Sequence, residues 1–257
     1  MLVLLSCAKT MSELSKVGVP LKTKPRFQSE ASAIALQMSQ MTVGELERLL
    51  RVSPKIAVEN YKRYQSFHAE GTPQLPALLA YTGIVFKRLN AKDFSSEDFE
   101  YAQQHLRLTS FCYGLLRPLD VIRPYRLEGD VVLPECGNQT LFAYWQTRLT
   151  ELFIEDIKKA GGILCNLASD EMKNLFDWRR VEKEVRVVTP EFRVWKHGKW
   201  TSVVVYLKMS RGEMARFILK NRIENPETLK NFSWEGFLFN ESLSDEKNFV
   251  FTNGGDI

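Results

Sequence analysis

Residues 98–129 read DFEYAQQHLRLTSFCYGLLRPLDVIRPYRLEG. We expect this stretch to form the centre of the fold, with the other segments packed around it. Its first half is apolar at positions that cover most of a helix circumference, which predicts a helix buried on several sides. Pro118 ends this predicted helix. One polar stripe runs along it at steps of four, three and four residues, formed by Gln103, Arg107, Ser110 and Gly114. Three arginines and a tyrosine lie around or after the proline, namely Arg117, Arg123, Tyr125 and Arg126. We therefore expect a buried central helix that brings cations to one site.

The composition is that of an ordinary globular protein. Hydrophobic residues make up 44% and charged residues 26% of the 257 positions, and this length suffices for a sizeable core. No internal repeat or composition shift divides the chain, so we expect a single domain over residues 1–257. The net charge of +4 favours an anionic partner only mildly and does not identify it.

The cysteines and the first residues predict a cytoplasmic protein. Cys7, Cys112, Cys136 and Cys165 lie far apart without a C-x-x-C pair, which fits a reducing compartment. The start of the chain lacks the basic region and the roughly 7 to 15 apolar residues of a signal sequence. No window approaches the roughly 20 apolar residues of a membrane span. Whether Cys7 or Cys112 senses oxidant depends on thiolate formation, which the sequence leaves open.

Polar residues follow several apolar runs that we expect to be buried strands, at 1–5, 77–81, 163–167 and 200–207. Lys9 follows the first run, and Lys208 with Arg211 follows the last. Ligands bind at the carboxyl ends of strands in open α/β sheets, so we expect these residues to meet in a cleft. A solvated Lys9 is the structural alternative, as is a plain helix N-cap at Ser169 or Asp170. The end of the third run, 163–167, and the residues after it would bring four more polar residues to this cleft, namely Asn166, Ser169, Asp170 and Glu171.

The other expected elements complete an α/β fold with a mixed central sheet. Helices are predicted at 29–40 and 141–159, the second ended by two glycines. Alternating or β-branched runs predict strands at 185–189 and 192–195, and short terminal strands at 237–239 and 249–251. Residues from Gly254 onwards are expected to fray.

A pair of helices joined by a very short turn is predicted at about 42–67. Thr42 and Glu45 match a capping box, and Ser53 as N-cap with Pro54 at the first position begins the second helix. Free N–H groups at such a helix start can bind a DNA phosphate, as in a helix-hairpin-helix element. An ordinary helical corner would give the same pattern. The residues suited to DNA contact are Arg51, Ser53, Lys55, Lys62 and Arg63.

Metal and cofactor chemistry is not expected. His68, His105 and His197 are scattered and offer no ligand spacing. No phosphate loop, dinucleotide fingerprint or G-x-S-x-G motif is present. The cations outnumber the carboxylates in the predicted cleft, which favours an anionic ligand such as a phosphate backbone.

Several motifs together resemble the YaaA family, bacterial proteins associated with resistance to peroxide stress. They are LLSCAKT at 4–10, AQQHLRLTSFCYGLLRPLD at 102–120, PYRLEG at 124–129, NLASDE at 166–171 and KMSRGEMARFILKNR at 208–222. The resemblance implies a single-domain α/β protein that binds DNA, with a positively charged cleft and a helix-hairpin-helix. It further implies an indirect role against peroxide, such as protecting DNA from oxidative damage. The chain departs from the family pattern at Cys7, Thr82, Ile84 and Met209.

Two functional hypotheses follow. The first is a cytoplasmic, monomeric DNA-binding module that prefers branched or distorted duplex and holds its backbone in the hairpin and the cleft. The cleft residues would be Lys9, Arg107, Arg117, Arg123, Tyr125, Arg126, Asn166, Ser169, Lys208 and Arg211, with Tyr125 able to stack on a base. The alternative is an enzyme acting on a base or nucleotide, with Lys9 as nucleophile or phosphate anchor and Asp170 or Glu171 as general acid/base. Asp120 or Glu128 could instead pair with Arg123 or Arg126 as pure structure.

Overall fold

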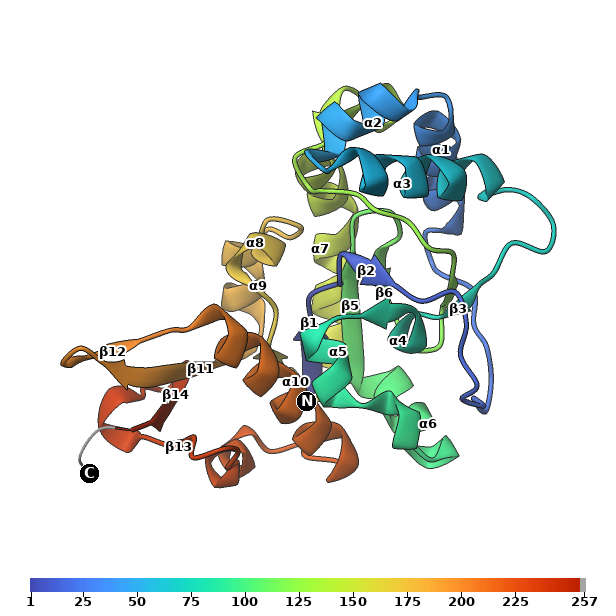
Figure 1. The fold of residues 1–257 in the computed structure, drawn as a ribbon. Coiled ribbons are helices and arrows are strands. Elements are labelled where there is room, and N and C mark those ends of the chain that lie inside the picture. Colours follow the sequence, from blue (N-terminus) through green and yellow to red (C-terminus); the bar gives the residue numbers. More distant parts are fainter. Residues whose placement is uncertain (255–257) are drawn as a thin grey trace.

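A mixed β-sheet forms the centre of the computed structural model, which describes residues 1–254 (Figure 1). Its strands are β1 (Leu2–Leu5), β5 (Leu106–Ser110), β6 (Gly114–Leu116), β10 (Ile163–Asn166), β11 (Arg186–Lys196), β12 (Lys199–Thr201), β13 (Leu238–Phe239) and β14 (Asn248–Asn253). The strand order is β13-β14-β11-β10-β1-β5-β6, and β12 pairs with β11. The neighbours from β14 to β5 are parallel, whereas β6, β12 and β13 are antiparallel to their partners. The predicted α/β class with a mixed sheet is therefore confirmed.

Helices surround this sheet. Three small two-stranded sheets lie outside it. The helices are α1 (Gln28–Ser39), α2 (Val43–Leu50), α3 (Pro54–Ser66), α4 (Ala77–Ala80), α5 (Ile84–Leu89), α6 (Ser96–His105), α7 (Leu141–Lys159), α8 (Asp170–Lys173), α9 (Trp178–Glu184) and α10 (Val204–Lys220). The small pairs are β2 (Thr10–Met11) with β4 (Tyr81–Thr82), β3 (Leu75–Pro76) with β7 (Val121–Ile122), and β8 (Val132–Leu133) with β9 (Gln139–Thr140). Figure 1 shows α1, α2 and α3 grouped at one end of the molecule and β11 to β14 at the other.

The predicted buried central helix is wrong beyond its first turns. Helix α6 ends at His105, and the next five residues form β5, which is parallel to β1 with Leu106 opposite Val3. Every residue of β5 is buried. A parallel strand covered on both faces is apolar almost without interruption, and periodicity alone cannot distinguish such a run from a buried helix. Gln103, Arg107, Ser110 and Gly114 therefore do not form one stripe on a helix.

Two other predicted strands are helical in the structure. Residues 77–80 form α4 rather than a strand, and only Tyr81 and Thr82 continue as β4. The strand predicted at 200–207 ends at Thr201, and α10 begins at Val204. β-Branched residues disfavour a helix by only a few tenths of a kcal/mol, so the packing of α10 against α5 and β11 decides the outcome. Lys208 and Arg211 consequently lie on a helix and not at a strand end.

The strands predicted near the C-terminal end are present with small changes. The runs at 185–189 and 192–195 belong to one strand, β11, which pairs with β14 on one side and β10 on the other. The short strands predicted at 237–239 and 249–251 correspond to β13 and β14. The predicted helix at 141–159 matches α7.

The predicted pair of helices at 42–67 is present as α2 and α3. Both halves of the capping box form, since the Glu45 N–H donates to Thr42 Oγ1 over 3.3 Å and the Thr42 N–H donates to Glu45 Oε2 over 2.7 Å. Helix α2 ends at Arg51, which is left-handed with φ of 50°. Pro54 occupies the first position of α3 as predicted, and Ser53 occupies the N-cap position without a capping hydrogen bond from its side chain.

The fraying expected from Gly254 onwards falls on residues 255–257, outside the described range. Within residues 1–254, no helix combines the length and the apolar character needed to cross a membrane.

Candidate functional site

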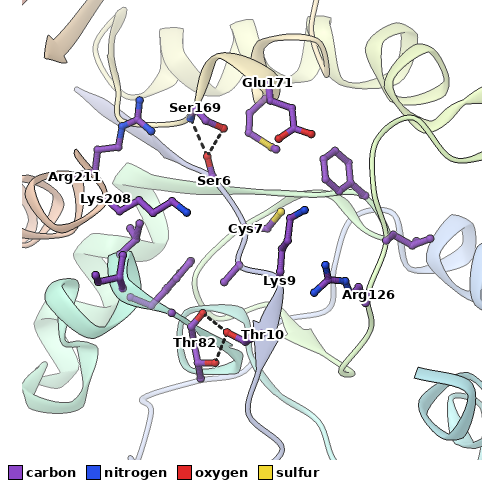
Figure 2. Close-up of a pocket in the computed structure, with 18 of the residues that line it drawn as sticks. Ser6, Cys7, Lys9, Thr10, Thr82, Arg126, Ser169, Glu171, Lys208 and Arg211 are labelled. Carbon is purple, nitrogen blue, oxygen red and sulfur yellow. Dashed lines mark hydrogen bonds between the residues drawn. The ribbon is translucent and has the colours of Figure 1, made fainter. Parts of the chain in front are cut away.

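A cavity of about 420 Å³ opens where β1 and β10 end (Figure 2). These strands are parallel neighbours, so the segments that follow them meet at one edge of the sheet. The Ser169 N–H donates to Ser6 Oγ over 2.9 Å, which joins the two segments directly. The structure brings seven of the predicted residues to this cavity: Lys9, Tyr125, Arg126, Ser169, Glu171, Lys208 and Arg211.

Two of the cations are held by one buried carboxylate. Lys9 Nζ lies 2.8 and 3.0 Å from the Glu128 oxygens, and Arg126 Nη2 lies 3.2 Å from Glu128 Oε1. The Glu128 side chain is 8% exposed, whereas that of Lys9 is 63% exposed. Pairing of Glu128 with Arg126 was one of the structural alternatives, but its role in anchoring Lys9 was not predicted. One carboxylate shared by two cations leaves a net positive charge beside the cavity.

The other two cations come from α10. Lys208 and Arg211 are three residues apart on this helix and both line the cavity. Figure 2 shows Lys208, Lys9 and Arg126 extending toward its centre. Arg211 Nε is buried without a hydrogen-bond partner, as is Arg126 Nε. Burial lowers the pKa of the Arg211 guanidinium, and the charge of Asp170 only partly opposes this. Because a partly buried cation without a matching carboxylate is costly, the site is suited to an anion.

The two adjacent carboxylates at the start of α8 point to different places. Glu171 lines the cavity and, among residues 1–254, makes no hydrogen bond or ion pair through its side chain. Asp170 instead pairs with Lys173 at 2.8 Å, and this hydrogen bond lowers the pKa of the Asp170 carboxyl. Asp170 lines a second, polar cavity of about 360 Å³ together with the buried Asn166. Only Glu171 of this pair is therefore placed to reach a ligand among the cations.

Three arginines expected in the cleft lie elsewhere and have structural partners. Arg107 is buried, with its Nε 2.6 Å from an Asp156 oxygen. Arg117 pairs with Asp120 at 2.8 Å. The Arg123 guanidinium donates to a backbone carbonyl at the C-terminal end of α3. Each of these cations already has an acceptor. The partner of Arg117 lies three residues away, whereas the partners of Arg107 and Arg123 lie on segments that are distant in the sequence.

Tyr125 lines the cavity but cannot act as a free stacking platform. Its ring is only 4% exposed, and its hydroxyl oxygen lies 2.7 Å from that of Tyr81 and 2.6 Å from Ser110 Oγ. Burial also raises the pKa of this phenol well above its ordinary value. Tyr125 is thus a fixed part of the wall, which corrects the expectation that it stacks on a base.

Cys7 lies in the cavity wall as an uncharged thiol. Burial raises its pKa to about 12, which outweighs the opposing hydrogen bond with Thr109. A thiol with this pKa is almost entirely protonated near neutral pH and reacts slowly with peroxide. Thr82 and Ile84 also line the cavity, and Thr82 Oγ1 is 3.0 Å from Thr10 Oγ1.

The cations of the helical pair fall into two groups. Arg51 pairs with Asp130 at 2.5 Å, and the largely buried Arg63 pairs with two glutamates. Lys55 and Lys62 are exposed and have no ion-pair partner among the described residues. The latter two are therefore the residues of α3 best placed to contact an external anion.

The helical pair and the cavity are joined by residues 126–130. The Tyr64 hydroxyl, from α3, donates to the carbonyl of the cavity residue Arg126 over 2.6 Å. Four residues later, Asp130 pairs with Arg51 at the end of α2. The helical pair is therefore linked to the cavity wall through this segment.

Comparison with known proteins finds the same family that the sequence motifs resemble. The family described as "Peroxide stress protein YaaA" matches residues 1–243. A protein of Bacteroides thetaiotaomicron named UPF0246 protein is 80% identical over 254 residues, covering 99% of each chain. UPF0246 proteins of Porphyromonas gingivalis and Teredinibacter turnerae are 47% and 36% identical, each covering 98% of this chain and 99% of the relative. With a match over nearly its whole length, the chain belongs to the peroxide stress protein YaaA family.

Proposed function

We propose that this member of a peroxide stress family binds DNA through the phosphate backbone and thereby protects it from oxidative damage. The observation that supports this most is the charge of the cavity described above. Four cations from three segments surround it, against one lining carboxylate, Glu171, and the buried Glu128 beside it. Charge-assisted hydrogen bonds from lysine and arginine are the usual contacts to phosphate. The four cations are Lys9, Arg126, Lys208 and Arg211.

The start of α3 is the second proposed contact. The first N–H groups of a helix have no partner within the helix and carry partial positive charge, so they attract phosphate. Lys55 lies in the first turn of α3, and Lys62 lies two turns further along. We propose both regions as DNA contacts, and residues 126–130 link them within the fold.

We expect the double variant Lys55→Ala/Lys62→Ala to bind DNA more weakly and with less dependence on salt. Each lost phosphate contact lowers the slope of log K against log salt by about 0.9, so the loss of both lowers it by about 1.8. Anisotropy titrations of labelled duplex, single-stranded and branched DNA across a salt series measure this slope.

The matched control is Lys196→Ala/Lys199→Ala, which removes the same charge from the β11–β12 turn, at the opposite end of the molecule in Figure 1. This pair should keep the wild-type slope. An equal loss in both double variants would contradict specific contact by α3. Absence of DNA binding by the wild type at low salt would contradict the proposed function as a whole.

One observation favours a second candidate, an enzyme that acts on a nucleic-acid base or nucleotide. A general acid or base must be able to reach the proton it transfers. Glu171 fits this need because its carboxylate faces the cavity and makes no hydrogen bond among residues 1–254. Lys9, in the same cavity, would then serve as phosphate anchor, since its ammonium is already paired with Glu128.

If the second candidate holds, Glu171→Gln should lower turnover by on the order of 10²- to 10⁴-fold, because the amide keeps the shape but cannot transfer the proton. It should not weaken DNA binding, since it removes a negative charge. Asp170→Asn is the control, because this neighbouring carboxylate faces away from the cavity. Product analysis with oligonucleotide and nucleotide substrates provides the readout. Equal turnover in both variants would eliminate Glu171 as the acid/base.

A further inference from the structure

The size of the cavity limits which part of a DNA molecule can enter it. Its volume of about 420 Å³ lies within the roughly 300 to 1,000 Å³ of small-molecule pockets. A duplex, whose major groove alone is about 12 Å wide, is too large for such a space. A ligand in the cavity must therefore be about as small as one nucleotide.

The wall of the cavity combines two kinds of surface. Phe86 and Phe111 are 7% and 4% exposed and present apolar surface at the cavity, together with aliphatic side chains. The cations Lys208 and Arg211 line the same space. A nucleotide has the matching two parts, since its base has flat apolar faces and its phosphate is anionic. Enzymes that extrude a nucleotide from DNA bury the base among apolar side chains in this way.

Two of the cations that line the cavity each have a buried donor without a partner among residues 1–254. Arg126 Nε and Arg211 Nε lack hydrogen-bond partners, although polar groups at such depth are nearly always paired. The remainder of Arg126 is fixed by Glu128, whereas Arg211 has no carboxylate within ion-pair distance among residues 1–254. Figure 2 shows Lys208 and Arg211 on one side of the cavity and Arg126 on the opposite side, so a single phosphate would be held by the two cations of α10.

We propose that this cavity binds a single unpaired nucleotide, with the base against its apolar wall and the phosphate at Arg211 and Lys208. This inference rests on the proposed DNA binding, and it assigns to the cavity the part of the DNA that leaves the duplex. Unpaired positions occur at bulges, mismatches and branch points, and extruding a base costs least there. Selectivity for distorted DNA follows from this arrangement.

The test compares a fully paired duplex with the same duplex carrying one bulged nucleotide. The wild type should bind the bulged duplex at least tenfold more tightly. Ala8→Trp fills the cavity without changing charge, because Ala8 lines it, and should reduce the ratio of the two affinities to about one. Lys208→Glu reverses a charge on an exposed position of the wall and should also lower this ratio. Thermal unfolding of both variants checks that they fold.

The outcomes separate this inference from the proposed function. Binding of both duplexes with equal affinity by wild type and folded variants overturns the nucleotide pocket but leaves DNA binding intact. Calorimetric titration with free deoxynucleoside monophosphates provides the second arm. If these bind and Ala8→Trp abolishes the binding while no DNA is bound, the ligand is a free nucleotide, and the assignment to DNA is overturned together with the proposed function.

Discussion

Asp156→Ala is expected to lower the free energy of unfolding by about 3–5 kcal/mol, because it leaves a buried guanidinium without its counter-ion. Asp156 is 3% exposed and accepts hydrogen bonds from Arg107 at 2.6 Å and Arg26 at 2.7 Å. These contacts tie β5 and the segment before α1 to α7. Urea unfolding at pH 7 measures the loss. Glu155→Ala is the matched control on the same helix, since the Glu155 side chain is half exposed and pairs only with Lys159, and it should stay within about 0.5 kcal/mol of wild type.

The pH dependence of this difference identifies the ion pair as its cause. Burial tends to raise the pKa of the Asp156 carboxyl, but hydrogen bonds from Arg26 and Arg107 outweigh it and lower the pKa below its ordinary value. The stabilisation is therefore complete above the unfolded pKa of about 3.9 and is lost as the pH falls through the lower folded value. Wild type and Asp156→Ala should converge in stability in strong acid. A gap that stays constant from pH 7 into strong acid would point to lost packing instead.

Gly212→Ala is expected to destabilise the protein by about 1–3 kcal/mol through overpacking. A methyl group at this position of α10 would overlap the carbonyl oxygen of Val85 and lie 2.7 Å from Arg88 Cβ, both in α5. A backbone carbonyl cannot rotate away as a side chain can, so the two helices must separate. Val85 lines the cavity, and α10 carries two of its cations, so any DNA affinity that depends on the cavity should also decrease.

Gly44→Ala is the control for this substitution. Gly44 also lies within a helix, α2, but the nearest atom to an added methyl is Arg48 Nη1 at 3.9 Å. Alanine is favoured over glycine in a helix by about 0.5–1 kcal/mol, so this variant should be as stable as wild type or more so. Equal stability of Gly212→Ala and wild type in urea would show that α10 and α5 are not in close contact.

Helix boundaries were predicted best where a local signal marks them. The capping box at Thr42 and Glu45 and the proline at position 54 require only neighbouring residues to form, and both helix starts were predicted correctly. The run around Leu106 was predicted wrongly because burial on both faces removes the alternation by which a strand is recognised. For Val204 to Leu207, contacts of α10 with α5 outweighed the preference of β-branched residues for strands.

In the candidate site, too, local patterns predicted some features and tertiary contacts decided the others. The sequence by itself determined that Lys9 and Glu171 each follow a buried strand, because apolar runs and their polar ends are local patterns. The structure makes these two strands neighbours and places both residues at one cavity. Only the tertiary structure decided which cations are free of a carboxylate partner and so remain available to an anionic ligand. Arg107 is neutralised by Asp156, 49 residues away, and Lys9 is anchored by Glu128, 119 residues away. Such pairings depend on how strands and helices pack against one another, and a carboxylate far along the chain carries no local signal of the cation it will meet.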